Sequence, residues 1–546
     1  MLSDSNREIR QAADSALSEF LREVSVSTVV EFGPIVSVLA RQCHSKERLN
    51  RLTAITWLAE LIHHPYSGGD ALLPYHAEVL GAIMRCISDG EVEIRLVAER
   101  SNDDLLSLVR DTTGSFELKP LLDTLTEELL NKEDVPTKMA ALRWINMLME
   151  KRKDDMNEFV HNLLPVLLRT LSDPSDTVVL LDLQVLSRIS LAAGMEETME
   201  SEKEEAQFQL VLNAILQLFA NDRNLLETRG SLIIRKLCVL LNAESVYIRM
   251  AEALSSYEEG GADVATLEFV STMVQTLNLI LLTASELHDL RSILASSFNN
   301  SHRGARSSSD CTEVFGALFY CWCHNPVSTF SLCLLAQAHD LSFALIKRFS
   351  DLEVTVGFLM QVDKLVQLLE SPIFVHLRLQ LLDVDTPYHA PLLKALYGLL
   401  MLLPQSDAFR SLNDRLTTVC NLRDNLGIKP TLEYDSEFTM PGSTKSFNLE
   451  RLLRRFDSVM KLHQEARERQ QELMLQQQRQ PQQSVPNAAT STDLVVQQAA
   501  GSPVSADARG NLLSNGASPT VVTRRALTGS PGQSNPIDMQ PSRDVQ

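Results

Sequence analysis

The fold is decided by a stretch in the first half of the chain that reads Ile87-Ser88-Asp89-Gly90-Glu91-Val92-Glu93-Ile94-Arg95-Leu96-Val97-Ala98. The same residue types recur at the same spacing at the start of the chain, as Asp4, Ile9-Arg10 and Ala13. In both copies the apolar residues fall on one face of a helix, and a residue that can cap a helix precedes them. Two matched copies in one chain indicate an internal structural repeat.

Further copies fill the rest of the first half. Trp57 and Trp144 stand at equivalent positions in the second and fourth copies, and a fifth copy opens with Leu171-Ser172-Asp173. A sixth, offset copy opens at Asn221-Asp222. The copies begin roughly every forty residues, which is the period of helix pairs in HEAT and armadillo solenoids. The competing interpretation, a bundle of unrelated amphipathic helices, does not account for positions that match from copy to copy.

The repeat carries three structural expectations. Capping of the helices that follow is expected from Asp4, Ser45, Asp89 and Asp173. Connections between adjacent repeats, rather than ligand contacts, are expected from Arg10, Arg51 and Arg95. The chain opens in the second helix of a repeat, so we expect a longer form with further repeats before it.

The composition is that of a helical, non-secreted protein. The 546 residues include 70 acidic and 50 basic ones, for a net charge of −20. An acidic chain has no general attraction to nucleic acid or to an anionic membrane surface, so any membrane association is expected to be indirect. Two long apolar stretches, 264–282 and 315–336, are interrupted by polar residues and are expected to be buried helices. Eight cysteines in a chain of this length, without a signal peptide, indicate a cytosolic or nuclear protein.

These patterns predict an all-α protein: a HEAT/armadillo-type α-solenoid followed by an all-helical C-terminal domain and a disordered tail. The predicted ranges are 1–241 for the solenoid, 242–420 for the C-terminal domain for partner binding and self-association, 421–446 for a linker, 447–473 for an amphipathic helix and 474–546 for the tail. The tail is rich in Gln, Ser, Pro, Ala and Gly, and such a segment cannot bury enough apolar surface to order itself.

The second half resembles a known family over long uninterrupted runs. The most characteristic run is Trp322-Cys323-His324-Asn325-Pro326, and similar runs cover residues 330–338, 361–372, 377–382 and 396–406. They resemble the C-terminal domain of the vacuole-morphology scaffold family, also called ArPIKfyve. The resemblance covers roughly residues 2–419 and is strongest over 322–416, whereas the HEAT half matches more loosely.

The resemblance implies a scaffold subunit of the PIKfyve lipid-kinase complex. Such a scaffold holds a phosphatidylinositol 3-phosphate 5-kinase together with an opposing Sac-domain 5-phosphatase, and so controls phosphatidylinositol 3,5-bisphosphate. The family also implies self-association through the C-terminal domain and a cytoplasmic protein that is peripheral on endosomal or vacuolar membranes. A chain without the N-terminal repeats of the family is expected to keep the phosphatase and to lose contact with the kinase. The alternative is a HEAT-repeat adaptor for membrane trafficking with other partners.

No residue pattern indicates catalysis, a cofactor or a metal. Phosphate-binding glycine loops, nucleophile elbows and metalloprotease helices do not occur in the sequence. Cys321 and Cys323 are spaced two residues apart and so point to different sides of a helix, with only His324 beside them. Buried packing is therefore favoured over a zinc site, and we expect no enzyme activity.

Candidate partner-binding residues come from the second half alone. The corner at Trp322, His324 and Asn325 interrupts two apolar helices, and its competing interpretation is a buried turn that satisfies its own backbone. A polar helix face, which is either solvated or the rim of an interface, is formed by Gln361, Asp363, Lys364 and Gln367. Within the stretches that carry the resemblance, we add Gln337 and Arg378.

The last predicted helix is capped by Asn448 and has an apolar stripe that includes Leu452, Phe456, Val459 and His463. Docking on the preceding domain and self-association are both open for this stripe. A position on a membrane surface is the weaker alternative, because no Trp anchors the stripe and the chain is acidic.

Overall fold

The computed structural model describes residues 4–27, 30–63, 72–112, 116–131, 134–190, 200–258, 263–298, 308–426 and 449–478. Every regular element within those ranges is a helix. The first half contains α1 (Arg7–Val26), α2 (Phe32–Gln42), α3 (Arg48–Ile62), α4 (His76–Ile87), α5 (Val92–Asp111), α6 (Leu118–Asn131), α7 (Val135–Lys151), α8 (Lys153–Asn157), α9 (Val160–Thr170), α10 (Asp176–Ser190), α11 (Glu200–Asn221) and α12 (Arg223–Leu240).

The second half continues with longer connections and short 3-10 turns. Its helices are α13 (Ala243–Ser256), α14 (Val264–Thr283), α15 (His288–Ala295), α16 (Ser308–Trp322), α17 (Pro326–Leu335), α18 (His339–Arg348), α19 (Val356–Leu369), α20 (Val375–Gln380), α21 (His389–Leu402), α22 (Asp407–Asn425) and α23 (Leu449–Gln478). The 3-10 turns are Leu73–Tyr75, Ser285–Leu287, Phe349–Asp351 and Pro372–Phe374.

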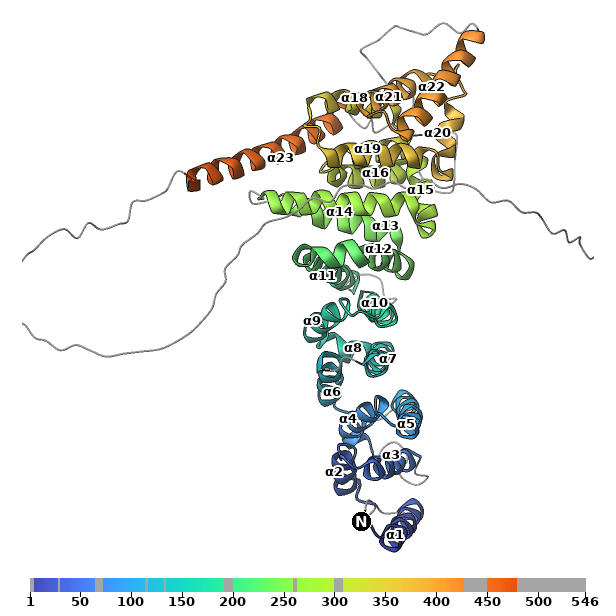
Figure 1. Cartoon of the computed structure of the whole chain (residues 1–546), viewed down its shortest axis with the longest axis vertical. Coiled ribbons are helices and arrows are strands. Elements are labelled where there is room, and N and C mark those ends of the chain that lie inside the picture. Colours follow the sequence, from blue (N-terminus) through green and yellow to red (C-terminus); the bar gives the residue numbers. More distant parts are fainter. Residues whose placement is uncertain are drawn as a thin grey trace, which may run out of the picture. The chain divides into compact units, whose positions relative to one another are not determined.

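The helices of the first half are stacked in two rows. One row is α2, α4, α6, α9 and α11, and the other is α3, α5, α7, α10 and α12, with consecutive members of each row in contact. Helix α1 contacts α3 and therefore belongs to the second row. Figure 1 shows these layers following one another in chain order. The predicted α-solenoid is confirmed, because each layer buries its apolar faces against its neighbours.

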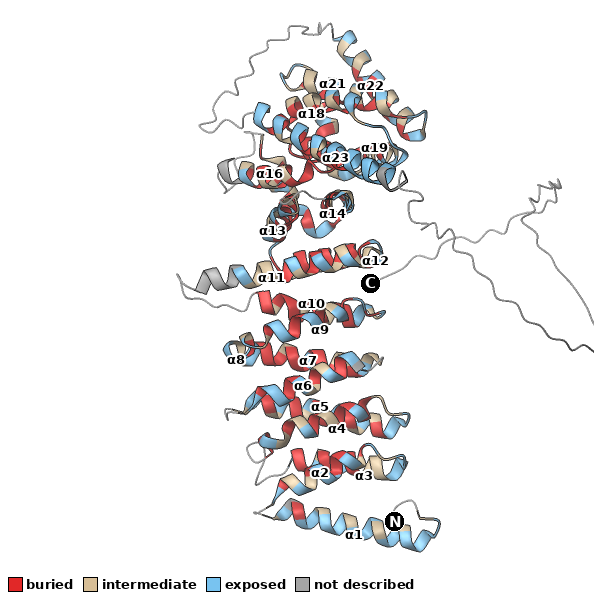
Figure 2. Ribbon diagram, turned by 90° about the vertical axis from the view of Figure 1, so that its left-hand side faces the viewer, coloured by how far each residue is buried: buried red, intermediate tan, exposed pale blue. Residues whose placement is uncertain are grey.

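Burial follows the periodicity that the repeat predicts. Ile94 and Ala98 of α5 are fully buried between layers. The equivalent face of α1 is more open, and Ile9 is 40% exposed. Figure 2 shows the contrast between the buried inner faces of the central layers and the largely exposed α1.

The predicted helix caps are wrong in detail. Asp89 accepts from the backbone N–H of Glu91 at 3.0 Å, just before α5 begins, and Glu91 at the cap position makes no side-chain capping bond. The same bond to the N–H two residues later is made by Asp4, Ser45 and Asp173. These side chains therefore close a tight turn that leads into the helix, instead of capping the helix itself.

The recurring arginines stabilise the same turns. Arg51 donates through Nη1 to the carbonyls of Ser45 and Lys46 at 3.1 and 3.0 Å. Its Nε and Nη2 also reach the two carboxylate oxygens of Asp89, at 2.6 and 3.1 Å, in the next layer. Lys138 makes the corresponding contact to Asp173 at 2.6 Å. For Arg51, the expected connection between adjacent repeats is confirmed.

The stacking continues past the end of the recognisable repeats. Helix α12 contacts α13 and α14, and residues 1–480 form one compact unit. A shared device supports this continuity: Trp144 Nε1 donates to Asn102 Oδ1 at 2.8 Å, and Trp322 Nε1 donates to Asn278 Oδ1 at 3.2 Å. The domain boundary at residue 241 stays a prediction, since packing is continuous there.

Two predicted boundaries shift. Helix α22 extends to Asn425, into the range predicted as a linker, and α23 continues to Gln478, beyond its predicted end at 473. The remaining linker residues, 427–446, and the tail from 479 onward lie outside the described residues. Among the described helices, α14 alone has the length and composition to cross a membrane, and half of its apolar window is buried in the fold. Burial of α14 agrees with the expected core helix.

Candidate partner-binding groove

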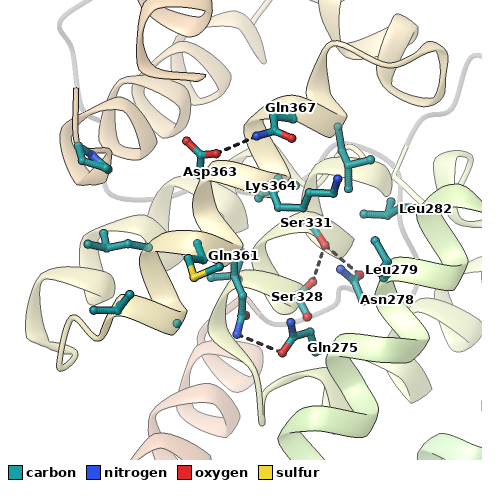
Figure 3. A pocket seen from close by; sticks show the side chains of 18 residues that line it. Gln275, Asn278, Leu279, Leu282, Ser328, Ser331, Gln361, Asp363, Lys364 and Gln367 are labelled. Atoms are coloured by element: carbon teal, nitrogen blue, oxygen red, sulfur yellow. Dashed lines mark hydrogen bonds between the residues drawn. The ribbon is translucent and has the colours of Figure 1, made fainter. Parts of the chain in front are cut away.

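A groove of about 810 Å³ lies between α14, α17 and α19, with Pro404 at its edge (Figure 3). Its floor is α17, in which every residue from Val327 to Leu335 is buried. Its walls are one face each of α14 and α19. A groove bounded by three helices offers a concave surface to another protein.

Local capping positions the floor and one wall. Asn325 accepts from the N–H of Ser328 at 2.9 Å, and Pro326 occupies the first turn of α17, where its missing N–H costs nothing. Thr355 caps α19 by accepting from the N–H of Phe358 at 3.1 Å. Both helices therefore begin at residues whose side chains satisfy otherwise unpaired backbone donors.

The walls leave large apolar side chains accessible. Leu279 of α14 is 44% exposed, while Val356 and Met360 of α19 are 75% and 68% exposed. All three line the groove. Exposed apolar surface gathered in a concavity is typical of an interaction site.

A polar rim surrounds these walls. Gln361 Nε2 donates to Gln275 Oε1 at 3.2 Å across the groove, joining α19 to α14. Asp363 accepts from Gln367 Nε2 at 2.8 Å and from Ser406 Oγ at 2.7 Å. Lys364 is exposed at the rim, and no carboxylate in the described part of the chain forms an ion pair with it. The rim thus presents amides and one cation to solvent (Figure 3).

A buried polar network supports the floor. Asn278, which lines the groove, accepts from Ser331 Oγ at 2.9 Å as well as from Trp322. Trp322 itself is fully buried behind the groove. The network joins α14, α16 and α17, so it fixes the relative positions of the floor and one wall.

The predicted site residues separate into two groups. Gln361, Asp363, Lys364 and Gln367 line the groove, and as partner contacts they stay a prediction. The other five make bonds within the chain. Of these, Gln337 has a left-handed backbone (φ 62°) and accepts from Gln380 Nε2 at 2.7 Å, while Arg378 donates to the carbonyls of Ser371 and Leu369.

The corner residues are likewise committed internally. Asn325 caps α17, and His324 lies between Glu258 and His463 at 2.9 and 3.0 Å. Both side chains are buried. This arrangement agrees with the alternative that the sequence left open, a buried turn whose side chains serve neighbouring groups.

Sequence reasoning missed the opposite wall. Gln275, Asn278 and Leu279 of α14 line the groove, together with Val356 and Met360 of α19. A signal did exist, because Gln275 and Asn278 are polar interruptions of the apolar stretch 264–282. That signal shows that one face of α14 is not simple core, although it does not show what α14 packs against.

The described residues contain no cluster of three or more His, Cys, Asp or Glu side chains that could hold a metal ion. Among the cysteines, burial raises the pKa of Cys321 to about 12. A buried thiol of this kind is inert, which fits packing and not chemistry.

Comparisons with known proteins place the groove in a region that a family model covers. Residues 223–419 match the model "Vacuolar protein 14 C-terminal", a region characterised in that family by its binding of a Sac phosphatase. Residues 9–179 match "EF3 N-terminal HEAT repeat". The groove lies entirely within the first range. A solved engineered protein also matches at 15% identity, covering 84% of this chain and 97% of that one, but its TM-score of 0.26 is too low to add to the fold assignment.

Curated relatives match most of the chain. A "Protein VAC14 homolog" from Arabidopsis thaliana is 42% identical over 77% of this chain and 52% of its own length. The Schizosaccharomyces pombe "Protein VAC14 homolog" is 33% identical over 77% of this chain and 49% of its own length. "Vacuole morphology and inheritance protein 14" from Saccharomyces cerevisiae is 29% identical over 71% and 41%. The chain spans about half the length of the curated relatives it matches. With its HEAT-type layers and its match to the C-terminal family model, the chain belongs to the Vac14 family.

Proposed function

We propose that this chain is a non-catalytic scaffold that binds a Sac-domain phosphoinositide 5-phosphatase through the groove between α14, α17 and α19. One observation carries the proposal: the groove lies inside the region that matches the family model for phosphatase binding. In this family the phosphatase opposes a phosphatidylinositol 3-phosphate 5-kinase. The scaffold would thereby control phosphatidylinositol 3,5-bisphosphate.

The chemistry of the groove suits a protein partner. Met360 and Val356 supply an exposed apolar centre, and Gln275, Gln361 and Gln367 surround it with amides. Interfaces commonly combine a desolvated apolar centre with a polar rim that fixes register. The cation of Lys364 favours a partner segment that carries a carboxylate beside its apolar residues.

The remaining parts of the proposal rest on the family resemblance. They are contact with the kinase, self-association through the second half, and a peripheral position on endosomal or vacuolar membranes. The net charge of −20 supports recruitment by partners rather than by anionic lipid.

The test is co-purification of the full chain with a co-expressed Sac-domain phosphatase. The groove variant is Met360→Glu, and its control is Met401→Glu on α21, a site that is 85% exposed and outside the groove. The unaltered chain and Met401→Glu should retain the phosphatase. Met360→Glu should weaken binding by about tenfold or more, as expected when a charge enters the centre of an interface.

The outcomes separate the two levels of the proposal. If the unaltered, folded chain recovers neither phosphatase nor kinase, the scaffold function is wrong. Recovery of coat or transport factors instead would favour the trafficking adaptor. If Met360→Glu binds as well as Met401→Glu, the scaffold function stands and the assignment of the groove is wrong.

A further inference from the structure

Helix α23 lies against a surface formed by α14, α16 and α18. Its buried side chains lie along one face and are Leu452, Leu453, Phe456, Val459, His463 and Ala466. From Arg467 through Leu475 every residue of α23 is exposed. The helix is therefore held by its first five turns, while its last turns project beyond the contact (Figure 1).

Ion pairs accompany this apolar contact. Arg455 makes a two-pronged contact with the carboxylate of Glu258, in which Nη1 lies 2.8 Å from Oε2, and it also donates to the carbonyl of Tyr320. Arg348 of α18 donates to Asp457 at 2.6 Å, and Arg467 donates to Glu353 at 3.1 Å. The Arg455–Glu258 pair is the most buried of the three, so it contributes most to holding the helix.

Two histidines meet at the centre of the contact. His324, which follows α16, has its Nε2 2.9 Å from Glu258 Oε1 and its Nδ1 3.0 Å from His463 Nε2. An ionised carboxylate only accepts, so His324 donates through Nε2 and its Nδ1 is left as an acceptor. His463 must then donate through Nε2, which places its own lone pair on Nδ1. The contact uses one proton per imidazole.

An added proton has no favourable position here. Protonation of His463 at Nδ1 creates a buried cation beside Arg467 on its own helix and His324 on the body. The nearby carboxylate, Glu258, is already engaged by His324 and Arg455. Protonation of His324 at Nδ1 instead would set two N–H groups against each other unless His463 changed tautomer. Both routes weaken the contact.

We propose that the surface of α14, α16 and α18 is a helix-binding site whose occupant is α23, and that the His324–His463 contact makes α23 detach as the solution is acidified. The inference does not depend on the proposed function or on any partner. It concerns a segment and a surface of the same chain.

The direction follows from the protonation states. Burial, with His324 and Arg467 nearby, lowers the pKa of His463 from 6.5 to about 4. The detached helix therefore binds a proton more readily than the docked helix, so docking is complete above pH 6.5 and is lost progressively between pH 6.5 and 4. At pH 5.5 the ratio of detached to docked α23 should be about tenfold higher than at pH 7.4.

The other charged groups at the contact do not titrate in this window. Burial acts to raise the pKa of Glu258, but the bonds from His324 and Arg455 outweigh it and lower the pKa to about 2. Glu258 therefore stays ionised between pH 7.4 and 5.5. Described charges that act on His463 are His324, Arg467 and Glu258. The charged side chain of α18 that reaches α23, Arg348, is paired with Asp457. His339, at the start of α18, also has a pKa lowered to about 4, but it bonds Gln380 and not α23.

The experiment is hydrogen exchange of the full chain at pH 7.4 and 5.5, read by mass spectrometry and corrected for intrinsic rates. Amides 449–466 should show an opening constant about tenfold higher at pH 5.5. The test variant is His463→Gln, whose side-chain N–H can still donate to His324 but does not titrate. It should remove the pH dependence of α23. The control is His288→Gln on α15, an exposed histidine far from α23 in the chain, which should keep it.

Each result decides the inference. An unchanged opening constant for α23 in the unaltered chain overturns it, and this arm needs no variant. An equal rise in His463→Gln shows that the histidine pair is not the sensor and also overturns it. A rise shared equally by α14 and α16 indicates general loosening in acid, which overturns a detachment specific to α23. A rise confined to α23 and abolished by His463→Gln supports the inference.

Discussion

The indole nitrogen of Trp322 donates to the side-chain oxygen of Asn278 at 3.2 Å, and Ser331 Oγ donates to the same oxygen at 2.9 Å. One buried amide thus joins three helices, α14, α16 and α17. Trp144 and Asn102 form the same pair in the solenoid. In the second half this pair also supports the candidate groove, because Asn278 lines it.

Asn278→Ala should destabilise the chain by about 2–4 kcal/mol, because it leaves two buried donors without an acceptor. Denaturant unfolding of the full chain measures this change. Gln275→Ala, one turn earlier on the same wall, should change stability by less than about 0.5 kcal/mol, because the bond it loses is exposed. Equal effects of the two substitutions would contradict a structural role for Asn278.

The connection between layers at Arg51 and Asp89 should be energetically coupled. The two side chains are mostly buried and make two hydrogen bonds, so a double-mutant cycle of Arg51→Met and Asp89→Asn should give a coupling of about 1–3 kcal/mol. The matched exposed pair between layers is Arg188 and Glu150, for which about 0.2–1 kcal/mol is expected. A larger coupling at the exposed pair would show that burial does not set the strength of these contacts.

The sequence was sufficient for the solenoid because each repeat is a local pattern. The spacing of Ile94 and Ala98 already places both on the buried face of α5. The role of Asp89 was misplaced, since sequence spacing does not show whether a side chain closes the preceding turn or caps the helix itself. That distinction depends on where the first helical hydrogen bond forms, and the choice shifts by only about two residues.

The groove and the α23 contact were beyond sequence reasoning for a different reason. Gln275 and Gln361 are 86 residues apart, and His324 and His463 are 139 residues apart, so neither pair has a shared periodicity. One side of each contact did show a signal. Gln361 stood out on a polar helix face, and His463 stood out on an apolar stripe. Their partners are determined by how helices from different layers pack, which no local pattern encodes.

Asp182 of α10 predicts an unusual dependence of stability on pH. The side chain is fully buried, and neither carboxylate oxygen has a hydrogen-bond partner among the described residues. Burial raises its pKa well above 3.8, so the folded chain holds a proton that the unfolded chain releases. This contribution to stability falls as pH rises above 3.8, by about 1.4 kcal/mol per pH unit while the folded carboxyl stays protonated.

Asp182→Asn should therefore raise the free energy of unfolding at pH 7 and reduce its pH dependence between pH 5 and 7. Unfolding curves at three pH values check both effects, and Asp123→Asn on the exposed face of α6 is the control. A gain from Asp123→Asn of the same size would point to net charge as the cause, rather than to burial of one carboxyl group.

Gly398 of α21 marks the closest approach of two helices in the second half. A Cβ built at this position would lie 2.7 Å from Ile346 Cγ1 and 2.9 Å from Ile346 Cγ2 on α18. In an open helix, replacing Gly by Ala gains about 1 kcal/mol. Here the branched Ile346 side chain has little freedom to move, so Gly398→Ala should instead lose about 1–3 kcal/mol through overpacking.

The matched control for this loss is Gly357→Ala on α19. A Cβ at Gly357 would meet nothing closer than Thr355 Oγ1 at 3.9 Å, so this substitution should be neutral or stabilising. Ile346→Ala in the Gly398→Ala background should recover part of the loss, because the smaller side chain makes room for the added methyl group. If Gly398→Ala proves as stable as Gly357→Ala, α18 and α21 separate at little cost, and their close packing does not hold the second half together.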